Sequence, residues 1–69
     1  MVQRSTLMFD WVITLRQLGI THWLAEAQRQ PWEHNQRVLA TGFDAHQAVE
    51  RISALTGLPE MELKRELMV

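Results

Sequence analysis

The chain has 69 residues, a formal net charge of −1 and no cysteine. This length predicts one domain, 1–69, with a marginal hydrophobic core. The composition excludes disulfides and thiolate zinc sites as braces, and the charge excludes a basic footprint for nucleic acid. No apolar run approaches the ~20 residues that a membrane-spanning helix needs. We therefore expect a cytoplasmic protein that is stabilised by tight packing, by self-association or by a partner.

The first segment, 6–18, carries two competing periodicities. Most of its apolar residues share one broad helical face, but Phe9 and Ile13 fall outside that face. The run from Leu7 to Leu15 also alternates as a strand would. Because a lone strand needs a partner and no other segment resembles one, we predict a helix, with a strand paired across a dimer as the alternative. The residues outside the helical face then predict a homodimer or a partner chain.

Two further short helices are expected in the middle of the chain. From Ile20 to Ala27 the apolar residues follow the i, i+3, i+4, i+7 spacing of one helix face. Pro31 either kinks this helix or begins the next one, 31–41. Gly42 then ends that helix.

The fourth segment has the clearest local signals. Asp44 and Gln47 stand at the N-cap and N3 positions of a capping box. Gly57 can adopt the left-handed conformation that closes a helix, with Leu58 folding back onto it. Pro59 can open a fifth helix at its first position.

The fifth helix is expected to be apolar on two sides. Leu63 and Leu67 lie on one side of its helical wheel, and Met61 and Met68 lie nearly opposite. One neighbour cannot cover both sides. Either a small bundle leaves the methionines exposed or the end of the chain frays, or one side packs inward and the other meets a partner. Flexible, polarizable methionine is suited to such a partner surface.

Residues 33–68 resemble the ubiquitin-associated (UBA) type of three-helix bundle. The resemblance rests on the loop Thr41-Gly42-Phe43, the following segment with Ala48 inside it, the turn Thr56-Gly57 and the apolar end of the chain. It implies an all-α fold: a small bundle of four to five short helices, with N-terminal helices in 1–30 and a UBA-like unit in 31–69. It also implies a protein-binding surface, which by position falls on these residues: Gly42, Phe43, Leu67 and Met68.

A rival resemblance is to a helix-turn-helix DNA reader, through the spacing of Ile52, Gly57, Leu58 and Leu63. Its second helix would present three glutamates, at positions 60, 62 and 66, to the DNA backbone. Phosphates repel carboxylates. DNA binding by a transcriptional regulator therefore stays the alternative function.

Enzyme chemistry has no support in the sequence. His22, His34 and His46 recur at intervals of twelve, which is not a metal-ligand spacing on one helix. There is no phosphate-binding loop, no nucleophile motif and no acid/base pair of carboxylates. We expect no catalytic residue, no metal and no cofactor.

These patterns predict a non-enzymatic protein-interaction module: an adaptor, an inhibitor possibly carried by a phage or mobile element, or a small subunit of an assembly. Its partner is expected to be another protein, in a homodimer or a hetero-complex. The predicted partner-binding residues are Trp32, Gly42, Phe43, Met61, Leu67 and Met68.

Overall fold

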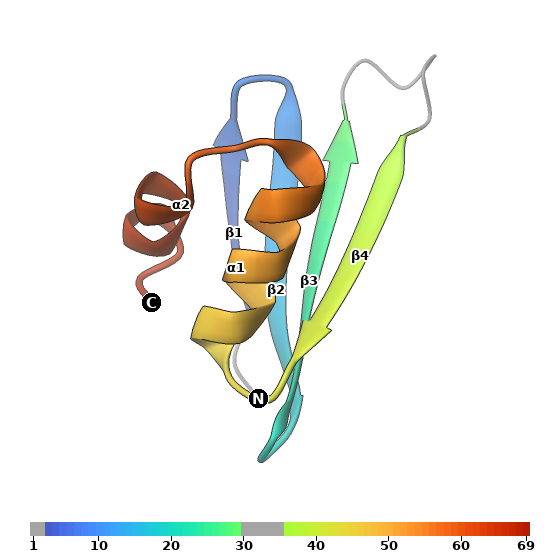
Figure 1. Cartoon of the computed structure of the whole chain (residues 1–69), viewed down its shortest axis with the longest axis vertical. Helices are drawn as coiled ribbons and strands as arrows, with labels where there is room; N and C mark the ends of the chain where they lie inside the picture. Colours follow the sequence, from blue (N-terminus) through green and yellow to red (C-terminus); the bar gives the residue numbers. More distant parts are fainter. Residues whose placement is uncertain (1–2, 30–35) are drawn as a thin grey trace.

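A computed structural model describes residues 3–29 and 36–69, and it shows a four-stranded antiparallel sheet with two helices (Figure 1). The strands follow one another in the sheet in chain order, β1-β2-β3-β4. The elements are β1 (Gln3–Met8), β2 (Trp11–Gly19), β3 (His22–Arg29), β4 (Arg37–Gly42), α1 (Ala45–Thr56) and α2 (Glu60–Glu66). The predicted all-α bundle is therefore wrong, and so is the resemblance to the UBA-like unit.

The segment predicted as the first helix forms β1, a tight turn and most of β2. Ile13 and Leu15 are fully buried on one face of β2, whereas Thr14 between them points to the other face. This is the alternation of a half-buried strand. Phe9 lies in the turn between the strands with φ 56 and is 77% exposed. Ile13 is thus covered within one chain, and the reason for placing it in a dimer interface does not hold.

The second predicted helix is strand β3. Ala25 and Ala27 are fully buried and lie opposite Leu15 and Ile13 of β2 in the register. Leu24 points to the opposite face of the sheet, although the helical spacing grouped it with Ala27. The interior face of the sheet requires period-2 alternation here, and that tertiary requirement overrides the helix-favouring Ala, Glu and Gln of this segment.

The third predicted helix, 31–41, is also wrong where the structure describes it, because 37–42 is strand β4. The strand ends where α1 passes close by. A Cβ atom added to Gly42 would lie 2.6 Å from the backbone nitrogen of Ala48 in α1. Only glycine allows the helix to approach the sheet at this point.

The local helix signals in the C-terminal part are confirmed. The Asp44 side chain accepts a hydrogen bond from the Gln47 backbone N–H, 2.8 Å, at the start of α1. The Gln47 side chain accepts in turn from the Phe43 backbone N–H, one residue before the cap. Gly57 ends α1 in the left-handed conformation, φ 78. Pro59 stands at the N-cap of α2, one position earlier than expected.

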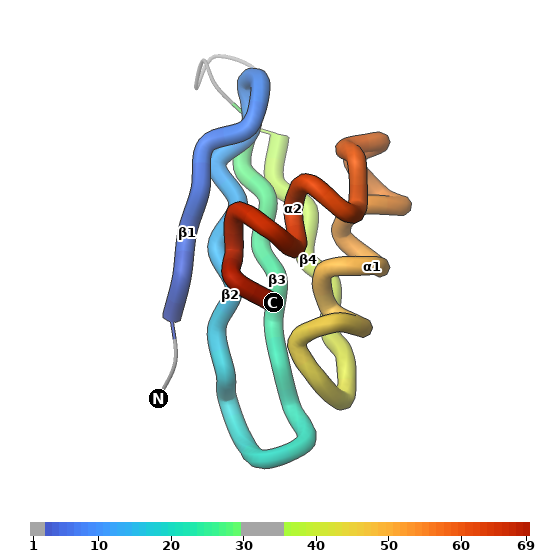
Figure 2. The backbone as a smooth tube through the Cα atoms, turned by 90° about the vertical axis from the view of Figure 1, so that its left-hand side faces the viewer, coloured from blue at the N-terminus to red at the C-terminus, as the bar shows by residue number. Residues whose placement is uncertain are grey.

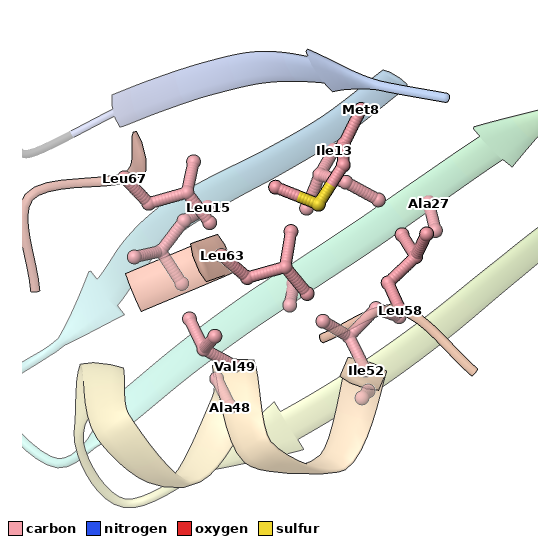
Figure 3. Packing of buried hydrophobic residues seen from close by; sticks show 12 residues of the cluster. Met8, Ile13, Leu15, Ala27, Ala48, Val49, Ile52, Leu58, Leu63 and Leu67 are labelled. Atoms are coloured by element: carbon pink, nitrogen blue, oxygen red, sulfur yellow. The ribbon is translucent and has the colours of Figure 1, made fainter. Parts of the chain in front are cut away.

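Both helices lie on the same side of the sheet, as the edge-on view of Figure 2 shows. The core lies between these two layers, and in Figure 3 Leu63 of α2 points between the β2 side chains and those of α1. Its fully buried large residues are Ile13, Leu15, Val49, Ile52, Leu63 and Leu67.

The helix-turn-helix resemblance is wrong for a packing reason. The buried stripe of α1, which includes Val49 and Ile52, faces the sheet. The two helices are therefore a cover for one face of the sheet and not a pair that offers its second helix to a groove of DNA.

Candidate functional site

Strand β4 lies at one edge of the sheet and leaves a row of backbone groups without a strand beside it. The backbone N–H of Arg29 donates to the carbonyl of Gln36, 2.9 Å, which makes these two opposed residues a hydrogen-bonded pair. Such pairs alternate along an antiparallel ladder. In the register of β3 and β4, the backbone groups of Val38 and Ala40 therefore face β3, and those of Leu39 and Thr41 face outward.

An independent contact agrees with this assignment. The Arg51 guanidinium of α1 donates a hydrogen bond to the outward-facing carbonyl of Thr41, 2.7 Å. No lysine, proline or inward-pointing charge blunts β4, although edge strands commonly carry such features. Leu39 at its middle is 52% exposed.

A groove of about 390 Å³ runs between β4 and the outward side of α1. It is lined by Ala40, Thr41, Arg51, Ala54 and Leu55. The small side chains on β4 and α1 leave the space open, and Leu55 forms an apolar wall that is 59% exposed. Leu55 thus lies on the outside of α1 and not among its buried residues.

A smaller hollow of about 120 Å³ continues from this groove toward the end of β4. The two hollows share Thr41 and Arg51. The second hollow adds His22, Phe43 and Gln47 to the lining, so it is more polar than the first. Together they form one concave surface along the β4 edge, which we call the β4 groove.

The side chains that line the β4 groove include a positive charge, that of Arg51. None of the described residues that line either hollow is acidic. Nearby carboxylates have partners already: Asp44 caps α1, Glu26 pairs with Arg37 across the open face, and Glu50 pairs with Lys64 of α2 at 3.0 Å. The hydrogen bond from Arg51 goes to a neutral carbonyl, and no carboxylate among the described lining residues balances its charge.

On the other side of α1, a charge pair joins the two helices. Lys64 donates to the Glu50 carboxylate and also lies 3.3 Å from Glu60. The hydrogen bond to Glu50 raises the pKa of Lys64 above its ordinary value, and Glu60 adds to this effect. The pair is a local clamp between α1 and α2, away from the β4 groove.

The structure separates the residues that the sequence grouped as a binding surface. Leu67 is fully buried in the core, and Gly42 is buried under α1. Phe43, 70% exposed, lines the β4 groove. Met61 and Met68 are exposed on and after α2. Trp32 lies outside the described residues.

Sequence reasoning missed Leu39 and Arg51. Leu39 and Arg51 belong to the candidate site only because β4 is an edge strand and α1 lies beside it. Neither fact follows from local sequence patterns. The β4 sequence, RVLATG, does not alternate between polar and apolar residues, so no local signal marked this strand.

The histidines do not form a metal cluster among the described residues. Residues 3–29 and 36–69 contain no group of three or more His, Asp or Glu side chains that could hold a metal ion. His22 and His46 are exposed, and His34 lies outside the described residues. Within the same ranges, neither helix has the length and apolar character to cross a bilayer.

Comparisons with known proteins add no relatives: no family model matches the chain, and no curated protein or solved structure matches it either.

Proposed function

We propose that this chain is a non-enzymatic protein-interaction module that binds an extended segment of another protein as a fifth strand along β4. The observation that carries the proposal is the row of outward-facing backbone groups at Leu39 and Thr41 beside an apolar groove. Main-chain hydrogen bonds to such an edge give affinity, and a neighbouring groove gives specificity by receiving alternate side chains.

The sides of an added strand would meet different surfaces. Neighbouring strands lie ~4.8 Å apart, so the new strand would run directly beside β4. On the helix side, alternate side chains would reach the β4 groove against Ala54 and Leu55. On the open side, the others would lie next to Leu39. Both surfaces offer apolar contacts to the same strand.

A selection of eight-residue peptides displayed on phage tests the proposal with the full chain as bait. Leu39→Pro removes an outward N–H and places a ring at the edge, while an edge strand tolerates the fixed φ of proline. We expect synthesised peptides from the selection to bind the unmodified chain at least tenfold more tightly than the Leu39→Pro variant.

Ser5→Pro is the matched control on the opposite edge. Continuing the alternation of hydrogen-bonded pairs through β3 and β2 places the backbone N–H of Ser5 outward as well. This variant should melt like Leu39→Pro and bind like the unmodified chain. Equal binding by all three proteins, or no peptide enriched above the Leu39→Pro background, would contradict the proposed function.

A further inference from the structure

We infer that the segment bound at β4 is acidic: it carries an Asp or Glu side chain that replaces the Thr41 carbonyl as the partner of Arg51. This inference rests on the proposed function and specifies its ligand. The central observation is that one guanidinium occupies the backbone acceptor that an incoming strand needs.

Strand addition brings a second donor to the Thr41 carbonyl. Its carbonyl accepts from Arg51 at 2.7 Å in the free chain. A fifth strand would offer a backbone N–H to this carbonyl in the plane of the sheet. Arg51 then competes with the strand for this carbonyl, and its exposed guanidinium is free to turn its donors to a carboxylate of the ligand.

The side chains that line the β4 groove favour a negatively charged acceptor in the ligand. The β4 groove holds Arg51 and His22, and none of its described lining residues is acidic. The carboxylates of the neighbouring elements are engaged elsewhere: Asp44 with the Gln47 N–H, Glu26 with Arg37, and Glu50 with Lys64 on the other side of α1. A carboxylate from the ligand fits the guanidinium bidentately, whereas a basic segment would be repelled.

A second copy of this chain is a poor occupant on the same grounds. An antiparallel pair of β4 edges would bring Arg51 of each copy, together with the rest of the lining of its groove, against β4 of the other copy. The sequence of β4, Arg37–Gly42, contains no acidic residue that could pair with Arg51. Complementary charge therefore favours a different, acidic chain.

The two hollows also set a spacing in the ligand. Side chains on one face of a strand recur every second residue, about 7 Å apart. Because the apolar and the polar hollow share Thr41 and Arg51, neighbouring same-face side chains of the ligand can occupy them. The expected motif is an apolar residue and an acidic residue separated by one position.

The phage selection described above tests this motif directly. We expect enriched peptides to contain Asp or Glu two positions from Leu, Ile, Val or Met. Replacing that acid by its amide in a synthetic peptide, with both ends blocked, should weaken binding to the unmodified chain about tenfold. The weakening should shrink as ionic strength rises, since exposed charge pairs are screened.

A double-mutant cycle assigns the effect to Arg51. In Arg51→Gln, which keeps hydrogen-bond donors and loses the charge, the acid and amide peptides should bind within twofold of each other. Arg51→Lys should keep part of the difference. Arg65→Gln, an exposed cation on α2, serves as control and should keep all of it.

Four other results of these experiments would each overturn one part of the inference. Enrichment of peptides without an acid overturns the acidic ligand and leaves strand addition intact. A tenfold acid preference that survives in Arg51→Gln keeps the acidic ligand but overturns Arg51 as its partner. Preference for a free C-terminal carboxylate over a blocked acid-containing peptide overturns the side-chain assignment. A dimer in light scattering that Leu39→Pro dissociates would name a second copy as the occupant and overturn the inference.

Discussion

The two edges of the sheet expose the same kind of backbone groups but have different neighbours. Beside β1, the Arg4 guanidinium donates to the carbonyls of Leu67 and Met68, 3.1 and 2.6 Å, and ties down the end of the chain after α2. Figure 1 shows α2 on the β1 side of the helical layer. Beside β4, α1 leaves a groove. Under the proposed function, β4 and not β1 binds a strand because of what flanks each edge, since both edges have free hydrogen-bonding groups.

Truncation of Leu67, in the segment that Arg4 holds beside β1, should have the largest effect on stability. Leu67 is fully buried, and Leu67→Ala should lower the free energy of unfolding by about 2–5 kcal/mol. Met68→Ala, next to it and exposed, should change stability by no more than ~0.5 kcal/mol. Thermal and denaturant melting measure both. Similar melting of the two variants would show that the end of α2 is not part of the core.

Arg4→Met separates the hydrogen bonds beside β1 from the packing there. The variant keeps an apolar stem and loses both bonds to the chain end. A loss of about 1 kcal/mol in the free energy of unfolding is expected, with faster amide exchange in α2 and unchanged exchange in α1. Equal acceleration in both helices would mean that Arg4 supports the whole helical layer and that the contrast between the edges is overstated.

Phe43→Ala examines the end of the β4 groove. Because Phe43 is 70% exposed, its truncation should cost less than ~1 kcal/mol of stability, well short of the ~3–5 kcal/mol of a buried phenylalanine. Binding of a selected peptide should weaken, since the ring lines the second hollow. A large loss of stability would make Phe43 a core residue and remove it from the site.

The smallest expected effect concerns pH and the clamp between the helices. The pKa of Lys64 is raised in the folded chain by Glu50, so its contribution to stability is present below the unfolded pKa of ~10.4 and fades as the pH rises through the folded value. The unmodified chain should therefore lose slightly more stability than Lys64→Met between about pH 9 and pH 12. Parallel pH profiles of the two proteins would show that the pair contributes nothing.

The sequence predicted the parts of the fold that depend on neighbouring residues only. Asp44, Gln47 and Gly57 set the ends of α1 through contacts within a few residues, so these signals survive in any tertiary context. The alternation from Leu7 to Leu15 was also visible. It was set aside because β3 did not resemble a strand.

The error at β3 has a physical cause. Ala25 and Ala27 have weak strand propensity, but they face the helical layer, where small side chains let α1 pack closely. Their strand conformation is imposed by pairing with β2 and β4. Without β3 as a partner, the sheet could not be inferred, and without the sheet neither the edge at Leu39 nor the groove beside Arg51 could be located.

Backbone amide exchange, measured residue by residue on the full chain with and without a selected peptide, tests the central claim most directly. The account predicts that the amides of Leu39 and Thr41 exchange quickly in the free chain and slow by at least tenfold when the peptide binds. The amides of Ser5 and Leu7 in β1 should not change. Slowing at β1 instead of β4, or unchanged exchange at Leu39 and Thr41 in a saturated complex, would contradict it.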